Sequence, residues 1–245
     1  MKLELQTPYI GSLEDSYLAR YGHCSQIESI ADVLSLYEDL KNKFVDCTPL
    51  FIFEDIKQCE YTSFHREIAD FSSEKIDDPT CKQQFLYTLE QLNKTKISFD
   101  EIYTETFFTE NFFKLRDVNN NPIHLFKYGL DIKLCPTKKS TDTFAAMING
   151  YFTGDFQPDE NYTIIQKLYN NYNFDFIGIG SVFLFFKVAQ PLSKELAKNL
   201  SDDLAKIYNF TSEQLQKMLD EHLTTKEYLF LPYAENFEDF ISEDY

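Results

Sequence analysis

The sequence predicts an α+β protein in which helices and short, mainly antiparallel strands are intermixed. Of its 245 residues, 43% are hydrophobic and 16% are aromatic, which is typical of a folded globular chain with a large core. Only 7 residues are Gly, so few turns with positive φ are expected, and this argues against an all-β fold. The apolar spacing changes between helical and strand periods without a regular βαβ rhythm, which favours α+β over a doubly wound parallel sheet.

A change of character at residues 135–140, Cys-Pro-Thr-Lys-Lys-Ser, indicates a boundary between two lobes. On this interpretation residues 1–135 form an N-terminal α+β lobe, residues 136–233 a C-terminal α+β lobe, and residues 234–245 an acidic tail. The alternative is a single compact domain, because a chain of this length can bury one large core.

The first part of the chain is expected to begin with a helix over residues 12–20, closed by Gly22. Ser25 to Glu28 has the form of a capping box, and apolar residues then recur at helical spacing as far as Leu40. The other expected elements of this part are a strand over 48–56, a helix from Asp78-Pro79 to Leu92, and a hairpin of segments 112–117 and 122–134 around a turn at 118–121.

The second part is expected to contain a helix over 141–149, a loop over 150–158 and a helix from Pro158 to about Tyr172. Segments 174–179 and 181–188 then form either a strand pair around Gly178 and Gly180 or one strand with a bulge. The remaining elements of this part are predicted as helices over 192–208 and from Thr211, and a strand over 228–231.

The charge of the chain restricts the partners that it can bind. A net charge of −17 disfavours nucleic acid and anionic membrane, since both are polyanions bound through Lys and Arg. It favours a basic protein partner, although an acidic balance also serves solubility alone. The longest uncharged apolar run, residues 176–186, is too short to span a bilayer.

Two further features predict a cytoplasmic protein. The first six residues carry no apolar core of signal-peptide length. The five Cys residues are odd in number and scattered, so we expect reduced thiols and no disulfide framework.

Motifs for catalysis are scarce, and no cofactor is expected. The four His residues lie far apart, and neither a phosphate-binding Gly loop nor a Gly-x-Ser-x-Gly elbow occurs. Asp46, Asp55 and Lys57 could form a Mg²⁺ site of a metal-dependent phosphodiesterase or nuclease, with the Lys positioning a water. About three such acid-x-Lys triplets are expected by chance in this composition, and three occur. The nuclease is therefore kept as the alternative function.

The leading prediction is a non-catalytic binding protein, of the immunity or inhibitor kind, that presents an acidic and aromatic surface to a basic protein. In the loop before Pro158, acids accompany Tyr151, Phe152 and Phe156, which we expect to be exposed. Acids in the first turn of a helix are also explained by the helix dipole alone. The tail offers a second acidic and aromatic segment. The predicted contact residues are Asp155, Phe156, Asp159, Glu160, Phe237, Glu238, Asp239 and Phe240.

Overall fold

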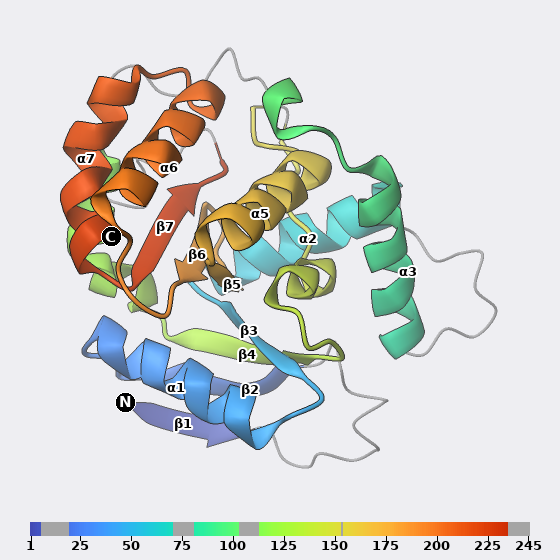
Figure 1. Cartoon of the computed structure of the whole chain (residues 1–245). Coiled ribbons are helices and arrows are strands. Elements are labelled where there is room, and N and C mark those ends of the chain that lie inside the picture. The colour runs from blue at the N-terminus through green and yellow to red at the C-terminus, as the bar shows by residue number, and fades with distance from the viewer. Residues whose placement is uncertain (6–19, 71–80, 103–112, 153, 235–245) are drawn as a thin grey trace.

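The computed structural model describes residues 1–5, 20–70, 81–102, 113–152 and 154–234. Within these residues seven strands form one sheet in the order β1-β2-β4-β3-β5-β6-β7 (Figure 1). The strands are β1 (Lys2–Leu5), β2 (Arg20–Ser25), β3 (Thr48–Ile52), β4 (Leu130–Cys135), β5 (Asp175–Ile179), β6 (Phe183–Lys187) and β7 (Tyr228–Pro232).

Helices pack around this sheet. The α-helices are α1 (Ile30–Lys43), α2 (Ile56–Asp70), α3 (Cys81–Thr95), α4 (Phe113–Asn120), α5 (Pro158–Tyr172), α6 (Lys194–Ile207) and α7 (Ser212–Thr225). The 3₁₀ helices are η2 (Phe99–Glu101), η3 (Pro122–Phe126) and η4 (Ser140–Ala146). Figure 1 shows α6 and α7 side by side next to β7, and α1 at the end of the sheet that holds β1 and β2. None of the helices in the described ranges is long and apolar enough to cross a bilayer.

The sheet is antiparallel except for one neighbouring pair. β3 runs parallel to β5, with Phe51 opposite Gly178 and Ile52 opposite Ile179. This pair joins strands from the two sides of residues 135–140, so both parts of the chain contribute to one sheet and one hydrophobic core. The mixture of helices with a mostly antiparallel sheet confirms the predicted α+β class.

Aromatic rings form much of the core on both faces of the sheet. Opposite residues of neighbouring strands project to the same face, so their rings can pack together. On one face the rings of Phe185 and Phe230 stack with their centroids 4.2 Å apart, and Tyr37 of α1 packs edge-on against Phe51 at 5.9 Å. The rings that pack together on the other face, under α5 and η4, are Phe144, Tyr162, Phe176 and Phe186.

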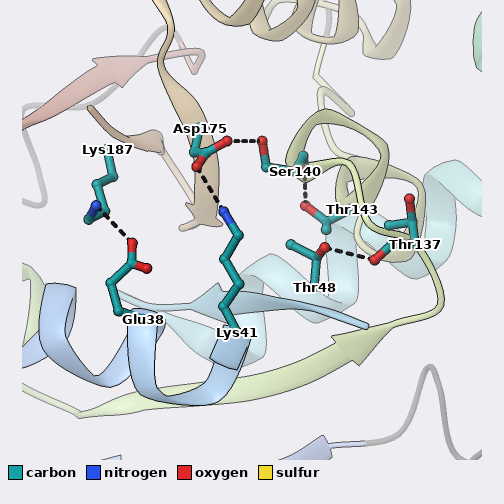
Figure 2. A network of polar contacts seen from close by, with 8 residues as sticks. All are labelled: Glu38, Lys41, Thr48, Thr137, Ser140, Thr143, Asp175 and Lys187. Carbon is teal, nitrogen blue, oxygen red and sulfur yellow. Dashed lines mark hydrogen bonds and ion pairs between the residues drawn. The ribbon is translucent and has the colours of Figure 1, made fainter. Parts of the chain in front are cut away.

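A polar network fastens α1 and η4 to the sheet (Figure 2). The carboxylate of Asp175, the first residue of β5, accepts hydrogen bonds from Lys41 Nζ of α1 (3.1 Å) and Ser140 Oγ of η4 (2.7 Å). Lys187, at the end of β6, forms an ion pair with Glu38 of α1 at 2.8 Å. These contacts fix elements from both parts of the chain against one another.

The predicted start of the helix that runs to Leu40 is wrong. Residues 20–25 form β2, which pairs with both β1 and β4, so Ser25 ends a strand and does not cap a helix. The helix α1 begins at Ile30, because Ser29 is the residue whose side chain accepts from the Asp32 N–H (3.2 Å). The helix expected over 12–20 falls largely outside the described residues.

The predicted hairpin around 118–121 is also wrong. Residues 113–120, which include most of its first arm and its turn, form α4. Its second arm begins as η3 and becomes a strand only at Leu130. The predicted α5 is confirmed from Pro158 to Tyr172, and the segments around Gly180 form an antiparallel pair, β5 and β6. Helix α2 was not predicted. Residues 53–55 of the predicted strand form the turn that leads into it, and Ile56 is the first residue of the helix.

Candidate functional site

The carboxyl ends of β3 and β5 lie together, because these two strands are parallel neighbours. Ligand sites of open sheets tend to lie where parallel strands end. Past the end of β3, the Phe53 N–H donates to Ile179 O (3.3 Å) and the Glu54 N–H donates to Leu125 O (3.0 Å). Glu54 then turns the chain into α2 with a φ of 60°, in the left-handed region that non-Gly residues rarely adopt.

The Glu54 carboxyl is buried against the turn between β5 and β6. Its Oε2 accepts hydrogen bonds from the Val182 N–H (2.9 Å) and from Ser181 Oγ (3.1 Å). Its Oε1 has no hydrogen-bond partner in the described part of the chain. Burial raises the pKa of Glu54 to about 8, against the opposing effect of these hydrogen bonds. A Cβ at Gly180 would lie 2.4 Å from Oε2, so only Gly leaves room for the carboxyl there.

Two buried side chains, Cys59 and Tyr233, lie close enough to this carboxyl to interact with it electrostatically, and Asn149 contacts Cys59. The Asn149 amide donates to Cys59 O of α2 (3.4 Å) and lies 3.7 Å from the Cys59 Sγ. The Tyr233 hydroxyl donates to Gly180 O (2.7 Å). Burial raises the pKa of the Cys59 thiol and of the Tyr233 phenol well above their ordinary values. Cys59 is therefore a neutral thiol and is unsuited to act as a nucleophile.

An exposed group of aromatic rings lies on α2 and on the segment that follows Gly150. The ring of His65 lies 4.3 Å from that of Tyr61 and 5.8 Å from that of Tyr151, and the rings of Tyr151 and Phe152 are 5.2 Å apart. Phe64 is 59% exposed, Tyr61 56%, Phe152 50% and Tyr151 39%. We call Tyr61, Phe64, His65, Tyr151 and Phe152 the aromatic surface.

The loop before α5 is built to hold Tyr151 and Phe152 outward. The Gly150 N–H donates to the Asn149 side chain (2.9 Å), and Gly150 has a φ of 112°. A Cβ at Gly150 would lie 2.1 Å from Phe156 O, so the close approach of these two main-chain segments requires Gly. The Asp155 carboxylate accepts from the Phe152 N–H (3.3 Å). Tyr151 and Phe152 thus stand on a loop that is held by its own hydrogen bonds.

The structure separates the predicted contact residues of this loop. Tyr151 and Phe152 are exposed, as expected, but Phe156 is 1% exposed and packs against Tyr208, so it is a core residue and offers no surface contact. Asp155 is buried as well. Asp159 and Glu160 are half-buried in the first turn of α5. Glu160 accepts from the Gln157 N–H (2.7 Å) in a capping box, which is the helix-capping role that explains this acid without a partner.

Four other predicted contacts, Phe237, Glu238, Asp239 and Phe240, lie outside the described residues. Glu54 and the aromatic residues of α2 were not predicted. Tyr61, Phe64 and His65 do follow the one-turn spacing of a helix face, and Asp55, which accepts from the Gln58 N–H, caps that helix. The helix was missed because Asp55 was assigned to the predicted strand over 48–56.

The proposed metal-site residues lie at different ends of β3. Asp46 precedes this strand and forms an exposed ion pair with Lys138 (3.1 Å). Asp55 follows the strand, is exposed, and accepts from the Gln58 N–H at the start of α2 (3.0 Å). Lys57 is exposed on α2. Over the residues that the structure describes, no three His, Cys, Asp or Glu side chains are grouped so that they could hold a metal ion.

Comparison of the chain with protein-family models, with curated proteins and with solved structures finds no match in any of the three. The candidate site therefore rests on its own geometry.

Proposed function

We propose that this protein is a non-catalytic cytoplasmic binding protein that presents the aromatic surface and its acidic charge to a basic protein partner. An immunity protein or an inhibitor of a basic protein is the kind of molecule that fits this proposal. The observation that carries it is the cluster of exposed rings on α2 and residues 151–152.

The exposed rings of α2 do not belong to the face of the helix that packs on the core. On α2, Cys59, Thr62 and Ser63 are buried, whereas Tyr61 and Phe64 face solvent. Tyr and Phe are large, rigid groups that are enriched in the buried centres of interfaces. Their faces also attract Arg and Lys, which is the chemistry that a basic partner offers.

The charge of the chain supports the same kind of partner. A net charge of −17 attracts a basic protein over a distance of about 8 Å at physiological salt and so raises the association rate. Near the aromatic surface, Glu60 is exposed on α2, one turn before Phe64. The two contributions can be measured separately, because contact through the rings mainly slows dissociation and attraction through the acids mainly speeds association.

The test removes exposed rings and leaves the core intact. The partner is first isolated with the tagged protein from its own cells, and binding of the two purified proteins is then measured. In Phe64→Ser/Phe152→Ser we expect Kd to rise by at least about 100-fold, mainly through faster dissociation, since hot-spot rings each contribute about 2 kcal/mol or more. Val45→Ser is the control, because Val45 is 71% exposed but precedes β3, at the other end of that strand. It should change Kd by less than about twofold.

The salt dependence of the association rate tests the electrostatic contribution to binding. Association should slow as salt rises from about 50 to about 500 mM, because the Debye length falls from about 14 to about 4 Å. An acidic partner, or an association rate that does not change with salt, contradicts the proposal. If the double variant binds as tightly as the wild type, the aromatic surface is not the contact. Truncation after Ala234 separately tests the predicted tail contacts.

A further inference from the structure

We propose that the neutral Glu54 carboxyl is a proton-dependent lock that fastens the start of α2 to the β5–β6 turn and so positions the aromatic surface. The lock is a property of this chain by itself. Only its effect on binding rests on the proposed function.

The main chain at Glu54 is held in a costly conformation. A left-handed backbone at a non-Gly residue is unfavourable and persists where the surrounding contacts enforce it. Here the enforcing contacts are the Glu54 N–H to Leu125 O and the two hydrogen bonds that the carboxyl accepts from the β5–β6 turn. If the carboxyl leaves that turn, the strain favours a rearrangement of the link between β3 and α2.

Burial, and not hydrogen bonding, favours the neutral form of the carboxyl, because donors to its oxygens stabilise the charged form. The Val182 N–H and Ser181 Oγ both donate to Oε2, whereas Oε1 is buried and has no hydrogen-bond partner in the described part of the chain. After ionisation Oε1 would bear negative charge in a buried position without a partner in the described part of the chain, which is strongly unfavourable. Ionisation therefore favours an opened arrangement in which water reaches the carboxylate.

The titratable groups that face Glu54 do not ionise in the pH range in which Glu54 does. Cys59 faces it from α2 and Tyr233 from the end of β7, and burial raises the pKa of both groups, so both stay neutral below pH 8. Two charged side chains act at the margin of this cluster. Lys133 of β4 acts on Cys59, and Asp155 acts on Tyr233. Of Glu54, Cys59 and Tyr233, only Glu54 ionises in the physiological range.

The lock is linked to the aromatic surface through α2. Cys59 lies on the first turns of α2, just before Tyr61, and Asn149 joins Cys59 O to the loop that carries Tyr151. Release of Glu54 would therefore loosen both halves of the surface, the rings of α2 and the rings after Gly150.

The direction of the pH effect follows from the two pKa values of Glu54. In the closed state the pKa is about 8, and in an opened, hydrated state it returns to its ordinary value near 4.5. The lock is therefore strongest below about pH 4.5, weakens about tenfold per pH unit up to about pH 8, and does not change above that.

Hydrogen exchange of the free protein tests the lock. Exchange of peptides covering residues 55–65 is measured by mass spectrometry at about pH 5.5, 6.5 and 7.5 and divided by the intrinsic chemical rate. In the wild type we expect the protection of these amides to fall by about 100-fold over this range. In Glu54→Gln, which keeps the shape and loses the titration, it should not change with pH. Peptides from α6, residues 194–207, serve as the internal reference.

Asp55→Asn is the matched control, because Asp55 is the neighbouring carboxylate but is exposed. It should keep the wild-type pH dependence. A flat wild-type profile overturns the lock, as does a Glu54→Gln profile that still falls with pH. If Glu54→Gln does not fold, Gly180→Ala, which crowds the carboxyl, should lower the protection at about pH 5.5 toward the value seen at about pH 7.5. No loss of protection in that variant also overturns the lock.

The same variants separate this inference from the proposed function. With the purified partner, the ratio of wild-type Kd to Glu54→Gln Kd should rise with pH, since any titration of the partner cancels in the ratio. A pH-dependent exchange profile without any partner binding leaves the lock standing and removes the function. Tight partner binding with a flat exchange profile does the reverse.

Discussion

His222 of α7 is a buried ring whose surroundings favour its neutral form. Its Nε2 lies 2.6 Å from Tyr228 O, so this nitrogen carries the hydrogen and donates it. Its Nδ1 has no hydrogen-bond partner within the described ranges, and the ring packs edge-on against the Tyr228 ring at 4.8 Å. Burial lowers the pKa of His222 to about 4. A protonated Nδ1 would add a buried, unpaired donor.

We expect His222 to make the fold sensitive to acid. Its lowered pKa means that the unfolded chain gains the proton first, so stability is complete above about pH 6.5 and falls as the pH drops toward about 4. Between about pH 7 and pH 5 the wild type should lose about 2 kcal/mol more than His222→Gln, whose amide still donates to Tyr228 O. Urea unfolding at both pH values measures this difference, and Glu54 contributes equally to both proteins. An equal loss in the two proteins would contradict the prediction.

Single residues of the candidate site differ in how far the sequence could predict them. Tyr151 and Phe152 could be placed at the surface, because they stand in a loop between Gly150 and Pro158. Phe156 in the same loop could not be told apart from them, since its burial depends on Tyr208 of a distant segment. Glu54 could not be predicted either. Its buried neutral form arises only when the chain returns at residues 180–182.

At the scale of elements, α4 closes one edge of the sheet. Among the described residues, β7 is the last strand of the sheet and pairs only with β6. On its outer side the Asn119 amide takes the place of a further strand: its Oδ1 accepts from the Phe230 N–H (2.9 Å), and its Nδ2 donates to Phe230 O (3.0 Å). The Tyr228 hydroxyl also donates to Asn119 O (2.9 Å). Both edge groups of Phe230 are therefore satisfied although they are buried.

We expect Asn119→Leu to destabilise the protein by roughly 2 to 5 kcal/mol, because it leaves a buried N–H and a buried C=O without partners. Asn120→Ala is the control, since Asn120 is exposed at the end of the same helix and should cost less than about 1 kcal/mol. Thermal and urea unfolding of the purified variants give the values. Similar stabilities for the two variants would show that Asn119 does not hold this edge.

Elements that are specified by their own termini were predictable. Pro158 and Glu160 define the start of α5 within one turn, and the predicted helix is confirmed. Residues 20–25 are the opposite case, because they form a strand only through β1 and β4, which lie far apart in the sequence. The Asn-rich segment 118–121 resembled a turn. Its Asn119 is instead used to bond β7, over 100 residues later in the chain.

At the scale of the whole molecule, the core shields the thiols from solvent. Cys24, Cys47, Cys59 and Cys135 are buried free thiols. Burial raises the pKa of Cys24, Cys59 and Cys135, which lowers the fraction of reactive thiolate further.

We expect the denatured protein to show five thiols without added reductant, since the sequence has five Cys residues in no disulfide pattern. In the native protein these four buried thiols should react with iodoacetamide at least about 100-fold more slowly than a free thiol, as the reagent must wait for opening. Mass spectrometry of labelled peptides follows each Cys separately. An internal disulfide, or rapid labelling of Cys59 or Cys135, would contradict this expectation.

The Asn119 contact also limits how copies of this chain could assemble through their strands. An open sheet edge can accept a strand of another molecule, whereas an edge whose outward groups are already bonded cannot. β7 is bonded by Asn119, and β1, at the other edge, pairs only with β2 among the described residues. While Asn119 stays bonded to Phe230, a strand of a second copy therefore cannot extend the sheet past β7, and a fibre cannot grow by strand addition at this edge.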